Sequence, residues 1–91
     1  MQYNKYMSKE EKLVKRLLGK PNDFTYKELV SLLSHLGYLE TQSGKTSGSR
    51  VAFINEKSKH IIRLHKPHPG NELKKYQIEQ LIEELRARSL I

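Results

Sequence analysis

The apolar residues of this chain change their spacing twice, and this change limits the folds open to it. Up to Gly37 they recur every three or four residues, which is typical of helices that bury one face. Between Tyr38 and His65 they alternate with other residues, which is typical of half-buried strands. From Ile78 to Leu85 the helical spacing returns. We therefore expect the element order α-α-β-β-β-α.

The first two helices have clear start signals. Ser8 with Glu11, and Thr25 with Glu28, have the spacing of a capping box. In this motif a hydroxyl and a carboxylate each accept a hydrogen bond from a backbone N–H that the helix leaves unpaired. Gly37 is the expected left-handed residue that ends the second helix.

Three short segments are expected to form an antiparallel sheet, at residues 38–42, around 51–53, and at 60–65. A sheet of this size is not stable alone, so the helices must cover one of its faces. The last helix is expected to begin between residues 71 and 75. The predicted class is therefore α+β, a three-stranded antiparallel sheet with helices on one face and an extra N-terminal helix.

Strand alternation predicts which side chains lie on the uncovered face of this sheet. If Val51 and Phe53 face the helices, Arg50 faces away from them. The same alternation in the next strand turns Arg63 and His65 outward. One open face is then expected to carry two arginines and a histidine.

Positive charge is concentrated in the region of the strands. The chain has 17 Lys and Arg against 10 Asp and Glu, a net charge of +7. Residues 45–75 contain eight of the basic residues and two acidic ones, hence 8 − 2 = +6. The basic residues are Lys45, Arg50, Lys57, Lys59, Arg63, Lys66, Lys74 and Lys75. Such clustering suits a surface that binds phosphates, and the alternative is a solvated face that keeps the protein soluble.

Several classes of protein are excluded by composition. The chain has no cysteine, so disulfide frameworks, thiolate zinc sites and cysteine nucleophiles are ruled out. A small domain without cysteine fits the reducing cytosol, so we expect a cytoplasmic protein. No apolar run approaches the roughly 18 residues that a membrane span needs, and no signal-peptide stretch is present, so no membrane association is expected.

Two other patterns do not form established sites. Gly44–Thr46 reads Gly-Lys-Thr, but Leu39 stands where a phosphate loop needs its first glycine. The spacing of His60, His65 and His68 matches no common zinc pattern, so no metal or other cofactor is expected. A histidine among basic residues suits proton transfer, because imidazole gains and loses a proton near neutral pH. The simpler interpretation is that these histidines only end a strand or a turn.

Two further motifs combine glycine with polar and aromatic residues. The first is a helix ending in Leu36–Tyr38, followed by Gly48 and Ser49 with an aromatic residue at Phe53. The second is the segment His68–Lys74, of sequence HPGNELK, which leads into the last helix. Together they resemble the motifs of the HicA family, the small ribonuclease toxins of bacterial and archaeal toxin–antitoxin pairs. The resemblance covers about two-thirds of the chain, from Phe24 to Leu85.

The resemblance implies a fold and a domain organisation. Members of the family have an α-β-β-β-α fold similar to that of double-stranded-RNA-binding domains. Residues 24–91 would form this HicA-like domain. Residues 1–23 would be an N-terminal helical extension, within one compact domain overall.

The resemblance also implies a metal-independent endoribonuclease that cleaves messenger RNA and is paired with an acidic antitoxin of the HicB type. The essential histidine of the family commonly follows Gly-Ser, and here that position is Arg50. A guanidinium does not lose its proton in a protein, so Arg50 cannot act as a base, but it can bind the scissile phosphate. His65 would then supply the proton transfer. The residues expected to bind RNA are Lys45, Ser49, Arg63, Lys66, His68 and Lys74.

Two alternatives remain open at this point. An arginine in place of the family histidine also suits a non-catalytic RNA-binding module, since such domains recognise RNA by its shape and backbone. A structural adaptor that uses the N-terminal helix is a third interpretation, supported only by Tyr3 and Tyr6 ahead of that helix.

Overall fold

The computed structural model describes residues 8–41, 50–67 and 70–91. The elements in chain order are α1 (Lys9–Leu18), α2 (Tyr26–His35), β1 (Tyr38–Thr41), β2 (Arg50–Asn55), β3 (Ile61–His65) and α3 (Lys75–Ala87). The predicted order α-α-β-β-β-α is confirmed. Within the described ranges, no helix is long and apolar enough to span a lipid bilayer.

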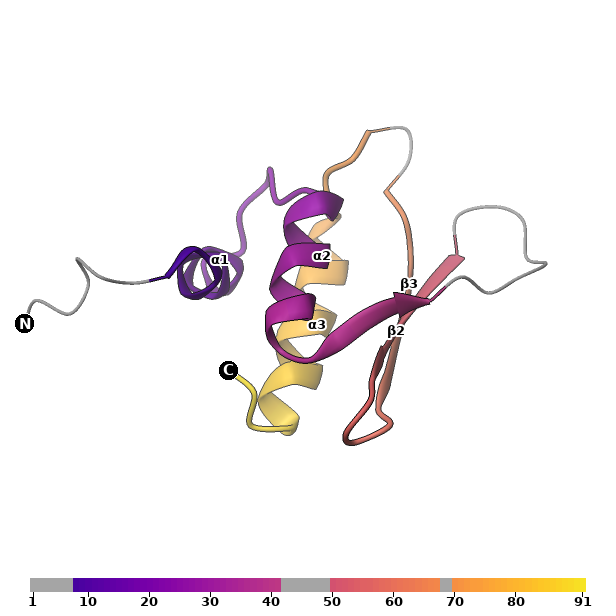
Figure 1. Ribbon diagram of the computed structural model, residues 1–91. Helices are drawn as coiled ribbons and strands as arrows, with labels where there is room; N and C mark the ends of the chain where they lie inside the picture. The colour runs from indigo at the N-terminus through magenta and orange to yellow at the C-terminus, as the bar shows by residue number, and fades with distance from the viewer. Residues whose placement is uncertain (1–7, 42–49, 68–69) are drawn as a thin grey trace, which may run out of the picture.

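The elements lie in three layers (Figure 1). The sheet has the order β1-β2-β3, and both strand pairs are antiparallel. Helices α2 and α3 cover one face of the sheet, and α1 packs against these two helices on the side away from the sheet. The predicted α+β class, with helices on one face and an additional N-terminal helix, is therefore confirmed.

Both predicted capping boxes are present. The N–H of Glu11 donates to Ser8 Oγ over 3.1 Å, and the N–H of Ser8 donates to Glu11 Oε1 over 3.0 Å. The same pair of bonds joins Thr25 and Glu28, at 3.1 and 2.9 Å. Gly37 has a φ of 98°, the left-handed conformation predicted for it after α2. These local signals therefore set the starts of α1 and α2 and the end of α2.

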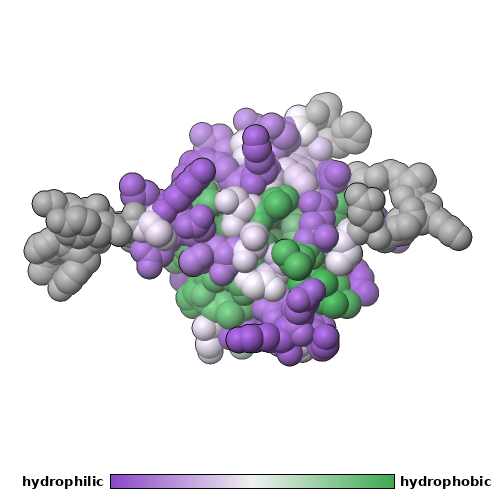
Figure 2. Space-filling view, in the orientation of Figure 1, coloured by the Kyte–Doolittle hydropathy of each residue, from purple (hydrophilic) through white to green (hydrophobic). Residues whose placement is uncertain are grey.

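The core contains side chains from all three layers. Leu17 of α1, Leu32 of α2, Phe53 of β2 and Leu85 of α3 are completely buried, and Ile62 of β3 is nearly so. All five belong to one cluster of buried apolar residues. Helix α1 therefore contributes to the same core as the sheet and the other two helices. Hydrophilic residues cover much of the visible surface, with apolar residues between them (Figure 2).

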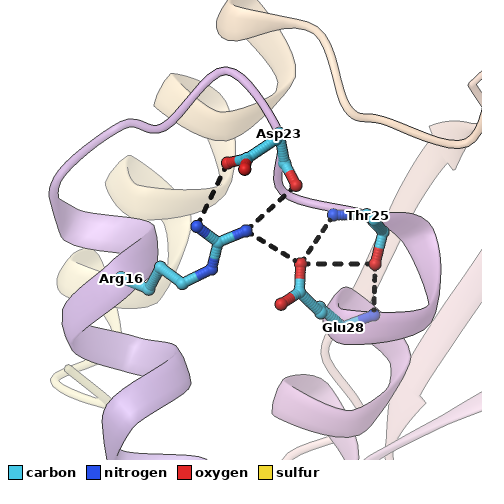
Figure 3. A network of polar contacts seen from close by, with 4 residues as sticks. All are labelled: Arg16, Asp23, Thr25 and Glu28. Atoms are coloured by element: carbon cyan, nitrogen blue, oxygen red, sulfur yellow. Dashed lines mark hydrogen bonds and ion pairs between the residues drawn. The ribbon is translucent and has the colours of Figure 1, made fainter.

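An ion-pair network joins α1 to the start of α2 (Figure 3). The Arg16 guanidinium donates to Asp23 Oδ1 over 3.1 Å, to the Asp23 carbonyl over 2.9 Å, and to Glu28 Oε1 over 3.1 Å. Glu28 Oε1 also accepts the N–H of Thr25. Partial burial acts to raise the pKa of Glu28, but the hydrogen bonds from Arg16 and Thr25 outweigh it and lower that pKa. The network therefore favours the charged form of Glu28 in the folded state.

Substituting glutamine for Arg16 is expected to lower the free energy of unfolding by about 1 kcal/mol at pH 7, because water and salt screen a pair that is one-third exposed. The contribution is present above the ordinary glutamate pKa of about 4.3 and is lost as the pH falls through the lowered folded-state pKa. Urea unfolding at pH 7 and pH 3 measures the difference between wild type and variant. An equal difference in the free energy of unfolding at both pH values would contradict this account. The control is Lys12→Gln, at an exposed position on the same helix.

Candidate nucleic-acid interface

The strand register brings the predicted residues together on the open face of the sheet. Arg50 of β2 lies directly opposite His65 of β3, and Arg63 lies opposite Ala52 on the same face. Val51, which alternates with Arg50 and Ala52, is buried against the helices. The two arginines and the histidine are all exposed. The prediction that these three residues share one face thus agrees with the structure.

Sheet geometry sets the spacing of these groups. Residues directly opposite each other in an antiparallel pair have Cα atoms about 4.5–5.5 Å apart, which applies to Arg50 and His65. Arg63 and His65 are two residues apart on one strand, hence about 7 Å. A guanidinium and an imidazole are therefore neighbours, with a second guanidinium one step along the strand.

Gln77 connects this face to α3. Its Nε2 donates to the His65 carbonyl oxygen over 2.9 Å, and its Oε1 accepts the N–H of Lys74 over 3.0 Å. Gln77 is buried, so both bonds are partly shielded from water. The backbone at the end of β3 is thereby held at a fixed position relative to the first turn of α3. Sequence analysis did not identify this residue, although its spacing of four from Leu81 places it on the buried side of α3.

Lys66 lies beside Tyr26 at the start of α2. It follows His65, the last residue of β3, and its Nζ lies 5.4 Å from the centre of the Tyr26 ring. The Tyr26 hydroxyl donates to Glu40 Oε2 over 2.7 Å. Burial, together with this carboxylate, raises the pKa of Tyr26, so its hydroxyl stays protonated. Lys66 therefore stands at the edge of the predicted RNA-binding surface rather than within it.

Of the remaining predicted RNA-binding residues, the structure describes only Lys74. Lys74 is exposed and directly precedes α3. Lys45, Ser49 and His68 lie outside the described residues.

His60 has a structural setting. Its Nδ1 lies 2.6 Å from the Tyr38 hydroxyl, and its Nε2 lies 3.1 Å from Glu84 Oε1. Burial raises the pKa of Tyr38, with the nearby charge of Arg88 opposing that effect. The protonated Tyr38 is therefore assigned as donor to Nδ1, and Nε2–H as donor to Glu84. These two contacts connect β1 and the residue before β3 to α3, away from the arginines of the open face.

In the part of the chain that the structure describes, no three His, Cys, Asp or Glu side chains gather closely enough to hold a metal ion.

The fold and the open face define a small basic α+β domain with a cationic sheet surface. The sequence model of one family, described as the HicA toxin of bacterial toxin–antitoxin systems, matches residues 26–86. This match runs from the start of α2 almost to the end of α3 and leaves out α1. The chain belongs to the HicA toxin family, as its motifs predicted. Neither the curated proteins nor the solved structures include a significant match to it.

Proposed function

We propose that this chain is a toxin that cleaves messenger RNA in the cytoplasm without a metal ion. The observation that carries this proposal is the direct pairing of Arg50 with His65 on the exposed face of the sheet. Membership of the HicA toxin family supports the toxin class. The net charge of +7 supports a polyanionic substrate.

His65 has the chemistry that the first step requires. A base removes the proton of the ribose 2′-hydroxyl, whose oxygen attacks the adjacent phosphorus while the 5′-oxygen of the next nucleotide leaves. Neutral imidazole accepts the first proton, and the resulting imidazolium, or water, returns one to the leaving oxygen. The products are a 2′,3′-cyclic phosphate and a free 5′-hydroxyl. Atoms and protons balance without a further reactant.

The arginines supply charge rather than proton transfer. Arg50 donates two parallel hydrogen bonds to the non-bridging oxygens of the scissile phosphate and stabilises the charge that develops on them. Arg63, about 7 Å from His65 along β3, would hold a neighbouring phosphate. Lys45, Ser49, Lys66, His68 and Lys74 are proposed as further RNA contacts. The protein partner is proposed to be an acidic antitoxin of the HicB type, since opposite charge favours that pairing.

The second candidate function is a non-catalytic RNA-binding module. The observation in its favour is Arg50 itself, which occupies the position of the family histidine and cannot act as a base. RNA would then bind to the same face without being cut.

Induced expression separates the two functions. The wild-type chain is expected to arrest growth and fragment cellular RNA on a gel, whereas His65→Ala, accumulating as soluble protein, does neither. Lys12→Ala, at an exposed position of α1, serves as the control and should behave as the wild type does. Growth arrest with intact RNA would favour the binding module. Normal growth with intact RNA, from folded wild-type protein, would contradict the toxin proposal.

A further inference from the structure

The open face of the sheet has a second part that is apolar. Leu39, Ile54 and Ile61 lie opposite one another across β1, β2 and β3. Their chain neighbours Tyr38 and Ile62 are buried against the helices, so alternation turns these three side chains to the open face. Leu39 is 51% exposed. We call Leu39, Ile54 and Ile61 the apolar row.

The apolar row is separate from the candidate RNA site. Ile54 lies four residues from Arg50 along β2, which corresponds to about 13 Å. Between them is a mixed row of Thr41, Ala52 and Arg63. The open face therefore changes along the strands, from cationic at the Arg50 end to aliphatic near the turn that joins β2 to β3.

We infer that the apolar row is the docking site of the antitoxin, whose contacting surface is apolar at its centre and acidic at its rim. The inference rests on the proposed function only in that the partner is an antitoxin. A row of large aliphatic residues on a sheet face that none of the described helices covers is typical of an interaction surface. The acidic rim follows from the cations around the row, namely Arg63 on one side and Lys57 and Lys59 in the turn on the other.

These cations are available for such a partner. Each of them is exposed, and none forms an ion pair with a carboxylate elsewhere in residues 8–41, 50–67 or 70–91. Carboxylates arriving from a partner would therefore meet cations that are not already neutralised, which favours binding and orients it.

Two other occupants fit the row less well. RNA bases stack on aromatic rings, and all three side chains of the row are aliphatic. A second copy of the chain, related by a two-fold axis, would bring the cations around the row of one copy toward those of the other while each chain carries +7. Charge complementarity therefore favours an acidic protein.

The substitution Leu39→Lys tests the inference because it has two opposite effects on binding of an acidic partner. The added positive charge favours an acidic partner, whereas the lost apolar contact disfavours it. The ligand is the purified antitoxin, identified as the protein whose co-expression restores growth. We expect Leu39→Lys to weaken its binding about tenfold or more, while Leu18→Lys, at a 36% exposed leucine on α1, changes it less than about twofold. Ile61→Thr, which keeps a β-branched residue in β3, is the second variant and should also weaken binding.

Unchanged or tighter antitoxin binding by folded Leu39→Lys would overturn the inference, as would a wild-type dimer that this substitution dissociates. Circular dichroism and the thermal midpoint establish that each variant is folded. Binding is measured without RNA, so its result is independent of whether the chain cleaves RNA. RNA cleavage, or RNA binding if there is no cleavage, should be the same in Leu39→Lys and the wild type.

Discussion

Substitution of His65 by alanine is expected to lower the rate of RNA cleavage by about 10²- to 10⁴-fold, because no other described strand residue on the open face can then act as a base toward the 2′-hydroxyl. RNA affinity should change much less, since Arg50 and Arg63 remain to bind phosphates. Cleavage of a labelled RNA by purified protein, together with the dissociation constant of an uncleavable analogue, measures the two effects separately. A cleavage rate unchanged from wild type would remove His65 from the mechanism.

Variants at Arg50 distinguish the effect of its positive charge on cleavage from the effect of its two parallel hydrogen bonds. Arg50→Lys keeps the positive charge but loses the two parallel hydrogen bonds, so the cleavage rate should fall by about 10²-fold or more. Arg50→His restores the residue type of the family at this position and is expected to retain cleavage. Its rate should also vary with pH between about 5 and 8 in a way that differs from wild type. Full activity of Arg50→Lys would contradict a bidentate role for the arginine.

Leu17→Ala is expected to destabilise the protein by about 2–5 kcal/mol, because it removes a fully buried side chain and leaves a cavity in the core. Leu17 belongs to α1, which the family match does not include, so the substitution tests whether this helix is integral to the fold. The measurement is the free energy of unfolding in urea, monitored by circular dichroism.

Leu18→Ala is the matched control. This neighbouring leucine is 36% exposed, so its substitution should lower the free energy of unfolding by less than about 1 kcal/mol. Equal effects of the two substitutions would show that α1 is not packed as described. Unfolding of α1 alone in Leu17→Ala, with the rest of the fold intact, would also contradict a core shared by all three layers.

Most of the fold could be predicted from sequence because its signals are local. Each capping box needs only residues within one helical turn, and Gly37 needs only its own backbone conformation. Alternation along each strand predicted the outward direction of Arg50 once Phe53 was assigned to the core, and that of Arg63 once Ile62 was assigned to it.

The remaining features depend on contacts between residues far apart in the chain. The opposition of Arg50 and His65 requires the register of β2 with β3, which the sequence between them does not specify. The bond from Gln77 to the His65 carbonyl depends on how α3 packs beside β3. The apolar row was missed because Leu39 in β1 comes opposite Ile54 only after the sheet is assembled.

The most direct test of the central claim is incubation of purified wild-type protein with a labelled messenger RNA in the presence of a metal chelator. Paired action of Arg50 and His65 predicts fragments that carry 2′,3′-cyclic phosphate and 5′-hydroxyl ends, and their loss in His65→Ala. Intact RNA, from protein that is folded and binds it, would contradict the claim and leave an RNA-binding module.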